Sequence, residues 1–517
     1  MPRKILWIDD EIDFLKPHIL FLKSKGYEVK ECVSGNDAVE ILRDRPEEWD
    51  LILLDENMPG MSGLETLEQL KIVAPDVPVV MITKSEEENL MDQAVGSQIR
   101  DYLIKPVNPN QILLSIKKIL DVDRLVSQQA SSSYRKEFMD LSRSISEAKD
   151  FQDWCGIYRR LTLRLLDFDE TAPDIAALLQ MQFEEAEAAF FRFVKKEYLP
   201  MIGPEHSEVL MSHNVVRERL LPRLREEGKA VLMVIDNFRL DQWLAVKPLV
   251  PENFNVVSAE LYCGLLPTAT QYARNALFSG LLPLEIEKRF PDLWIDEDDP
   301  RSKNLNEMPL VRHLLDNEGF KDTKLNFYKA NSSSRLSEII RDINPDAQGL
   351  TVIVINFIDI LSHAKTESEM VKELASTDAA YRSLTVSWFR HSPIQDLLRK
   401  FAGAGVDVML TTDHGMIRVD KPVKVIGDKT VNTALRYKCG KNLDYPAKEV
   451  MEISRPFDAG LPAPNLSTRY IFAGGHDFFV YPNNYNHFVR QYSDTYQHGG
   501  VSMEEMILPL IILKGKI

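Results

Sequence analysis

Four short apolar runs in this chain are each followed within two residues by an aspartate, and this pattern limits the fold more than any other feature. The runs are Lys4–Ile8, Leu51–Leu54, Ala230–Ile235 and Asp407–Thr411, and the acids after them are Asp9, Asp55, Asp236 and Asp413. Helix-forming stretches separate the runs, which is typical of parallel sheets covered by helices. Because ligands bind at the carboxyl edge of such a sheet, we expect the acids to lie there.

Two α/β segments are joined by a helical one. Residues 1–122 alternate strand and helix patterns, with strands predicted at Lys4–Ile8, Leu51–Leu54, Val79–Ile82 and Tyr102–Ile104. Residues 123–210 hold few β-branched runs and many helix formers, so they are predicted to form a helical connector. Residues 211–517 return to the α/β pattern, with strands predicted at Ala230–Ile235, Thr351–Ile355, Asp407–Thr411 and Met506–Leu513.

Charge and composition argue against several classes of protein. The formal net charge is -16 and no basic helix-turn-helix pattern follows the first α/β segment, so direct DNA binding is not expected. No apolar run is long enough to cross a bilayer, and the first residues lack the pattern of a signal peptide. The 4 cysteines are widely spaced without a CxxC pair, which is typical of a reducing compartment. We therefore expect a cytoplasmic protein without membrane insertion.

The acids of the first segment are accompanied by a hydroxyl and an ammonium group at other strand ends. Asp9, Asp10 and Asp55 repel each other unless a hard cation joins them, and Mg²⁺ prefers carboxylate oxygens. A carboxylate beside Mg²⁺ can accept a phosphoryl group covalently. Thr83 and Lys105 end two further predicted strands and supply the partners that a new phosphate group needs.

Residues 1–122 resemble the receiver domain of response regulators, which has a flavodoxin-like fold. The match lies in Asp9-Asp10, in Asp55-Glu56-Asn57-Met58-Pro59-Gly60, in Thr83 and in Lys105-Pro106, where a cis peptide bond is also predicted. The resemblance implies that a sensor histidine kinase phosphorylates Asp55. It implies Asp10 and the Asn57 carbonyl as Mg²⁺ ligands, with Asp9 acting through water. It also implies a switch pair, Thr83 and Tyr102, and we expect phosphorylation to promote a homodimer.

Aspartates and histidines recur in the second α/β segment at spacings that suit metal ions. The six candidate ligands are Asp236, Asp359, His363, Asp413, His414 and His498. Asp359 follows a run, Val352–Ile358, that is predicted as a strand, and His363 comes four residues later, on the same face of a helical turn. Mixed Asp and His ligands suit Zn²⁺ or Mn²⁺, and six of them suit two ions rather than one.

A hydroxyl nucleophile for such a centre is available between these ligands in the sequence. Thr268 or Thr270 can begin a helix that ends near Gly280. A hydroxyl at a helix N-terminus lies at the positive end of the helix dipole, and a metal ion lowers its pKa further. A threonine that only caps the helix is the alternative, and such caps are common.

Residues 211–517 resemble the PglZ group of the alkaline phosphatase superfamily. The superfamily order is an Asp, a Thr or Ser nucleophile, an Asp with a His four residues later, an Asp-His pair and a distal His, and it is met by Asp236, Thr270, Asp359, His363, Asp413, His414 and His498. The resemblance implies two zinc sites, one formed by Asp236, Asp413 and His414 beside Thr270, and the other formed by Asp359, His363 and His498.

Thr270 is preferred to Thr268 on the spacing found in nucleotide pyrophosphatase relatives. Their nucleophile lies three residues after a Pro and ten before a Gly, and Pro267 and Gly280 give Thr270 both spacings. These relatives also carry an Asn three residues after the nucleophile, where this chain has Ala273. The candidate substitutes for that phosphate contact are Arg274 and Asn275, with His476 as a further, weaker candidate.

A receiver joined to a PglZ segment by a helical connector resembles PorX-type response regulators over the whole chain. That resemblance implies control of type IX secretion. The expected chemistry is hydrolysis of phosphodiesters, such as cyclic or short linear nucleotides, by family analogy and because no arginine for a dianion is evident beside Thr270. The alternative is a catalytically idle docking module that binds a sigma factor or a secretion component when Asp55 is phosphorylated.

Overall fold

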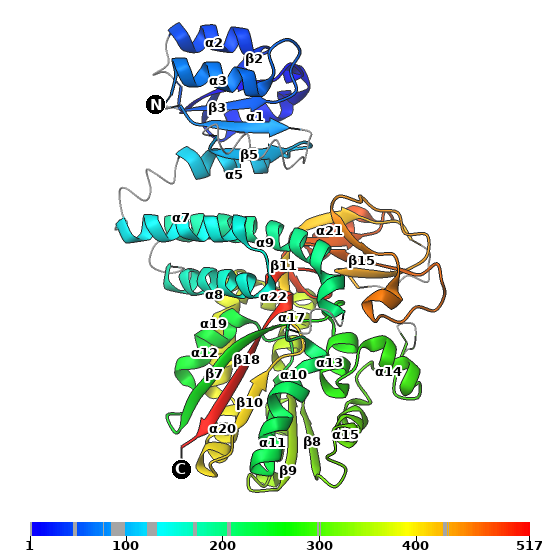
Figure 1. Cartoon of the computed structure of the whole chain (residues 1–517). Coiled ribbons are helices and arrows are strands. Elements are labelled where there is room, and N and C mark those ends of the chain that lie inside the picture. Colours follow the sequence, from blue (N-terminus) through cyan, green and yellow to red (C-terminus); the bar gives the residue numbers. More distant parts are fainter. Residues whose placement is uncertain are drawn as a thin grey trace. The chain divides into compact units, whose positions relative to one another are not determined.

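The computed structural model describes residues 3–44, 49–75, 77–83, 99–120, 132–168, 173–203, 208–296, 299, 301–427, 432 and 434–516. The chain separates into two compact units, Met1–Asp140 and Leu141–Ile517 (Figure 1). Residues 123–131 of the predicted connector lie outside the described residues. Among the helices that are described, none is both long enough and apolar enough to span a membrane.

The N-terminal unit is a parallel sheet with helices on both faces, as the alternating pattern predicts. Its strands are β1 (Arg3–Ile8), β2 (Tyr27–Cys32), β3 (Leu51–Asp55), β4 (Val79–Thr83) and β5 (Asp101–Ile104), in the order β2-β1-β3-β4-β5. Its helices are η1 (Ile12–Leu15), α1 (Lys16–Ser24), α2 (Gly35–Asp44), α3 (Gly63–Val73) and α5 (Pro109–Leu120). The predicted flavodoxin-like architecture is confirmed.

The central strands of this sheet are buried because helices cover both of their faces. Leu42 of α2 and Leu67 of α3 pack on one face, whereas Ile19 of α1 and Ile112 of α5 pack on the other. This explains why β3 and β4 are continuous apolar runs. The parallel pairing of β1 with β3 makes both strands end at the same edge, as the pattern predicts.

The connector is mainly helical over its described residues, and from Leu141 on it belongs to the C-terminal unit. Its helices are α7 (Ser132–Glu147), α8 (Phe151–Phe168) and α9 (Pro173–Ile202). Aromatic rings hold α8 against α9, with centroids 5.5 Å apart for Trp154 and Phe190 and 5.9 Å apart for Tyr158 and Phe183. Buried side chains of these helices, among them Leu141, Tyr158 and Phe190, belong to the same hydrophobic core as the C-terminal sheet.

The main sheet of the C-terminal unit is mixed. Its strands are β6 (Lys229–Ile235), β7 (Phe254–Cys263), β8 (Leu325–Ala330), β9 (Gly349–Ile355), β10 (Val408–Thr411) and β18 (Ile507–Gly515), in the order β7-β18-β10-β6-β9-β8. Strands β10, β6, β9 and β8 run parallel, and β18 runs antiparallel to β10 and β7. The parallel strands therefore deliver their C-terminal residues to one edge.

Further helices and small sheets complete this unit (Figure 1). The helices are α10 (Ser212–Val215), η4 (Val216–Leu220), α11 (Leu221–Glu227), α12 (Leu240–Val246), η5 (Lys247–Leu249), α13 (Thr270–Ser279), α14 (Pro283–Arg289), α15 (Glu307–Asn317), α16 (Ser333–Asp342), α17 (Phe357–Glu367), α18 (Glu369–Leu374), α19 (Asp378–His391), α20 (Ile394–Gly403), η6 (Pro456–Ala459), α21 (Tyr485–Tyr492) and α22 (Met503–Met506). The small sheets pair β11 (Ile417–Val419) with β17 (Thr495–Gln497), β12 (Lys421–Lys424) with β16 (Asp477–Val480), and β15 (Arg469–Ala473) with both β13 (Tyr437–Gly440) and β14 (Val450–Ile453).

Of the two ends predicted for the strand before Asp359, Ile355 agrees with β9 and Ile358 is wrong. The run Val352–Ile358 is predicted as a strand that ends before Asp359, but β9 ends at Ile355 and α17 begins at Phe357. The first turn of α17 is itself apolar, because Ile358 is fully buried and the Phe357 ring stacks on a tryptophan of α19. A buried helix start of this kind cannot be told from a buried strand by periodicity. Asp359 therefore lies in the first turn of a helix.

Candidate active site and phosphorylation site

The first site lies at the carboxyl edge of the N-terminal sheet, where β1, β3 and β5 end. Lys105 Nζ lies 2.6 Å from Asp55 Oδ1 and 2.9 Å from Asp9 Oδ2, so one ammonium group links both acids. Asp9 and Asp55 are buried, whereas Asp10 and Asn57 are exposed. One oxygen from each of the three aspartates lies within 4.8 Å of the others, which is a spacing that a cation can bridge.

The electrostatics of this edge favour a divalent cation. Burial raises the pKa of the Asp55 carboxyl; Lys105 opposes the shift, and the charges of Asp9 and Asp10 add to it. Burial lowers the pKa of Lys105, but its bonds to Asp55 and Asp9 outweigh burial, and the net shift is upward. One ammonium group therefore faces three acids, and a Mg²⁺ ion would balance the excess negative charge.

The predicted switch pair is in contact. The Thr83 hydroxyl, fully buried at the end of β4, donates to the Glu56 carboxylate and also shares a hydrogen bond with the Tyr102 hydroxyl. Burial raises the pKa of Tyr102, so this phenol stays neutral. The Lys105–Pro106 peptide bond is cis, as predicted. The contact of Thr83 with Glu56, the residue after Asp55, was not predicted.

The second site begins with a buried triad at the carboxyl edge of the C-terminal sheet. Asp236 follows β6, and Asp413 and His414 follow β10, the strand beside it. His414 Nε2 lies 3.8 Å from Asp236 Oδ1 and 3.6 Å from Asp413 Oδ2. All three side chains are buried, and Asp236 Oδ1 has no hydrogen-bond partner within the described part of the chain. An unpaired buried carboxylate oxygen beside an imidazole nitrogen fits a metal ion.

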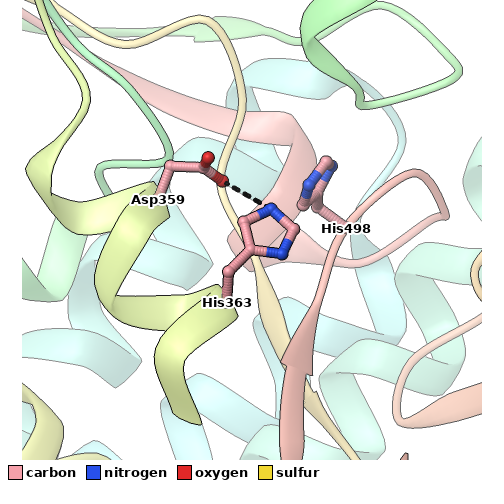
Figure 2. A group of neighbouring side chains, drawn as sticks. All are labelled: Asp359, His363 and His498. Atoms are coloured by element: carbon pink, nitrogen blue, oxygen red, sulfur yellow. Dashed lines mark ion pairs between the residues drawn. The ribbon is translucent and has the colours of Figure 1, made fainter. Parts of the chain in front are cut away.

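A second triad lies next to the first and is more exposed. Helix α17 carries Asp359 and His363 one turn apart, with His363 Nε2 3.6 Å from Asp359 Oδ1, and His498 reaches them from the loop after β17 (Figure 2). Ligand atoms of the three lie within 4.8 Å of one another. His498 also joins the triads, because its ring stacks on His414 with centroids 4.3 Å apart. Burial, with the neighbouring His414, lowers the pKa of His498 to about 4, so this ring is neutral and can bind a metal near pH 7.

The two threonines of the nucleophile motif have different surroundings. Thr270 is the first residue of α13, is partly exposed, and places Oγ1 3.2 Å from His414 Nε2. Thr268 is fully buried: its hydroxyl donates to Gly500 O at 3.0 Å and accepts from the Gly499 amide at 3.0 Å. The hydroxyl of Thr270 thus faces the triads, while that of Thr268 is engaged by the His498 loop.

The predicted substrate contacts Arg274 and Asn275 bind protein groups in the structure. Arg274 is fully buried and binds the carboxylates of Asp236, Asp413 (Nε to Oδ2, 2.9 Å) and Glu307 (3.2 Å). Asn275 is also buried, and its amide donates to Gln271 O at 2.8 Å. Helix α13 thus buries both side chains among protein partners.

His476 lines a cavity of about 540 Å³ whose wall includes side chains of connector helices α8 and α9. Arg239, which follows β6, Asp378 of α19 and Arg418 of β11 also line it. As far as the described residues go, the lining includes none of the six predicted metal ligands. Its Nδ1 is 2.7 Å from Arg418 O, so one ring nitrogen is already engaged by the backbone.

Two residues that contact the triads or their partners, Asn237 and Glu307, were not predicted from the sequence. Asn237 follows Asp236 with a positive φ of 66°, and its amide donates to Asp359 Oδ1 at 3.3 Å, which connects the two triads. An Asn directly after a strand-end Asp is a recognisable signal, because Asn tolerates the left-handed region. Glu307 begins α15 and binds Arg274, and no local pattern marks that contact.

Comparison with known protein families agrees with this division of the chain. Residues 5–117 match the response regulator receiver domain, residues 124–202 the PorX response regulator linker domain, and residues 215–513 the BREX system PglZ alkaline phosphatase-like domain. The last match covers more than half of the chain. The fold and the sites thus define a response regulator with an alkaline phosphatase-like output domain. The chain belongs to the PglZ family, and its receiver, linker and PglZ domain follow the PorX-type arrangement.

Individual relatives match between 109 and 168 residues of this chain. The chain is 34% identical to a CpxR homolog of Haemophilus influenzae over 168 residues, covering 32% of this chain and 69% of the relative. It is 33% identical to the PhoB protein of Pseudomonas aeruginosa, covering 23% of this chain and 52% of the relative, and it covers only 28% of the ARR14 regulator of Arabidopsis thaliana. A CheY-like receiver structure from Methanospirillum hungatei is 28% identical over 23% of this chain and 95% of that one, with a TM-score of 0.22.

Proposed function

We propose that this chain is a response regulator whose C-terminal domain hydrolyses phosphodiesters at a dinuclear zinc centre, under the control of phosphorylation at Asp55. The observation that carries the proposal is the position of Thr270, whose hydroxyl lies 3.2 Å from a ring nitrogen of the buried triad. Asp236, Asp413 and His414 are the proposed ligands of one ion. Asp359, His363 and His498 are the proposed ligands of the other.

Thr270 is the proposed nucleophile in a two-step reaction. When bound, two zinc ions would lower the pKa of the Thr270 hydroxyl and balance charge on the departing oxygen. The Thr270 oxygen attacks phosphorus, the bond to one ester oxygen breaks, and the threonine proton leaves with that alcohol. Water then cleaves the phosphothreonine and returns a phosphomonoester and free Thr270. The N-terminal end of α13 favours the negative charge that develops near Thr270.

The proposed substrates are cyclic or short linear nucleotides. A phosphomonoester carries two negative charges on its transferred group and is usually met by a free guanidinium. Arg274, the arginine nearest to Thr270 in sequence, is bound to three carboxylates instead. A phosphodiester carries one negative charge, so it depends less on a free guanidinium beside Thr270.

The proposed regulatory role follows from the receiver and the PorX-type arrangement. A sensor histidine kinase is the proposed phosphoryl donor for Asp55. Asp10 and the Asn57 carbonyl are the proposed Mg²⁺ ligands, with Asp9 acting through water, and Lys105 is the proposed partner of the phosphate. Control of type IX secretion from the cytoplasm, with a sigma factor or secretion component as a further partner, is part of the same proposal.

Hydrolysis of bis-p-nitrophenyl phosphate, measured beside zinc content, tests the proposal. Thr270→Val should keep its zinc and lose turnover by several powers of ten, as loss of a nucleophile does. Thr351→Val is the matched control; it also removes the hydroxyl of a buried threonine, in β9 and within reach of the Asn326 amide at 3.4 Å, so it should cost stability more than chemistry. A zinc-loaded wild-type protein without turnover on any phosphodiester would instead favour a docking module.

A further inference from the structure

Helix α22 lies against the loops that carry both triads. The Gly415 amide, next to His414, donates to Glu505 O of this helix at 3.3 Å. A Cβ atom on Gly415 would lie 1.9 Å from Glu504 O, so only glycine permits this approach of the two backbones. Any shift of α22 along this contact would therefore move the turn that holds Asp413 and His414.

The side chain of Glu505 ties α22 to the other loops of the site. Its fully buried carboxylate accepts from the Gly500 amide at 2.8 Å and from the Thr268 hydroxyl at 3.3 Å, and it pairs with Arg436 at 2.6 Å. Thr268 O in turn lies 3.0 Å from His498 Nδ1. One carboxylate therefore fixes the loop that precedes Thr270 and the loop that carries His498.

The connector holds the other side of α22. Glu187 of α9 is buried, and its Oε1 accepts from the Met503 amide, the first residue of α22, at 2.9 Å. Burial and the facing carboxyl of Glu504 raise the pKa of Glu187. One turn further along α9, Phe191 packs on Gly474, where a Cβ atom would lie 2.5 Å from the ring. Connector helix α9 is thus in direct contact with α22, the helix that lies against the loops of both triads.

We propose that Glu505 is a positioning residue for both triads, and that connector helix α9 sets the position of α22 through Glu187. A movement of α9 would then shift α22 and, through it, the loops that carry the proposed metal ligands. The receiver would not need to touch the substrate for this to happen. This inference rests on the proposed function for its activity readout, but metal affinity provides a second readout that needs no substrate.

The test compares full-length variants at Glu187. Glu187→Ala removes the acceptor for the Met503 amide, and it should weaken zinc binding or turnover by about 10- to 100-fold, the usual effect of losing a group that orients metal ligands. Glu187→Gln keeps that acceptor and can donate to Glu504, so it should restore near wild-type values. Glu184→Ala, on the same helix three residues earlier and partly exposed, is the control.

Zinc affinity is measured by competition with a chromophoric chelator, and turnover with bis-p-nitrophenyl phosphate. The proposal is overturned if Glu187→Ala and Glu184→Ala behave alike in both measurements, or if Glu505→Gln loses zinc affinity while Glu187→Ala does not. If the wild-type protein binds zinc without turnover, the proposed hydrolysis fails, and the zinc affinities of the same variants still decide whether α9 positions the metal centre.

Discussion

At the scale of single residues, the receiver site depends on the placement of Asp55. Its carboxyl is buried within 2.6 Å of Lys105 and close to Asp9 and Asp10, which is the arrangement that Mg²⁺-assisted phosphorylation needs. We expect acetyl phosphate and Mg²⁺ to add one phosphoryl group per chain, and Asp55→Ala to abolish labelling. Asp13→Ala, an exposed carboxylate of the same domain, should be labelled like the wild type. Equal labelling of Asp55→Ala would show that another residue is the acceptor.

The contacts of Arg274 with the acids of the buried triad could not be predicted from the sequence. Its partners come from three distant segments, and it binds both acids of the buried triad, Asp236 and Asp413. Arg274→Lys retains the charge but cannot bind both acids with a fork of donors, so zinc affinity should fall by about 10- to 100-fold. Arg219→Lys, in a partly exposed pair with Glu260, should leave zinc affinity unchanged. Chelator competition measures both variants, and unaltered zinc affinity in Arg274→Lys would contradict this role.

At the scale of elements, α17 is the helix on which the exposed triad depends. It places Asp359 and His363 on one face, one turn apart, and His498 completes the set from another loop. His363→Ala should remove one of the two proposed zinc ions and abolish hydrolysis, because two ligands rarely retain zinc against competing water. His391→Ala, an exposed histidine at the end of α19, is the control. Metal analysis by mass spectrometry decides the matter, and full zinc content in His363→Ala would contradict the assignment.

The strands that the sequence predicts and those that it misses differ in their place in the sheets. The buried central strands β3, β4, β6 and β10 are continuous apolar runs and were predicted. Strands β2, β7 and β8 were not, and each lies at the edge of its sheet with mixed burial. Strand β5 is also an edge strand with mixed burial, yet it was predicted from Tyr102–Ile104, so an edge position weakens the sequence signal without removing it.

The same contrast holds inside the candidate active site. The six predicted ligands were chosen from strand ends, one helical spacing and the superfamily order, and the structure brings them together in two groups of three. The contacts that support them, such as Arg274 with Glu307 or Glu505 with Arg436, join segments that share no local pattern. Of these four residues, only Glu505 has a local sequence signal, because Ser502 and Glu505 have the spacing of a helix N-cap.

At the scale of the whole molecule, the connector belongs to the C-terminal unit by its packing and to the receiver by its place in the chain. Helices α8 and α9 share the hydrophobic core of the main sheet, and α9 touches α22 through Glu187. Contacts therefore run without a break from α9 through α22 to the turn that carries Asp413 and His414.

We expect phosphorylation of Asp55 to convert single chains into dimers. The phosphate would draw in the Thr83 hydroxyl, which now bonds Glu56 and Tyr102, and the Tyr102 ring on edge strand β5 would turn inward. The face after Thr83 includes residues 84–98, which lie outside the described residues. With Mg²⁺ and beryllium fluoride, the scattering mass at micromolar concentration should rise from 59.2 kDa toward twice that value. Asp55→Ala should stay at the mass of one chain, and an unchanged wild-type mass would rule out a phosphorylation-driven dimer.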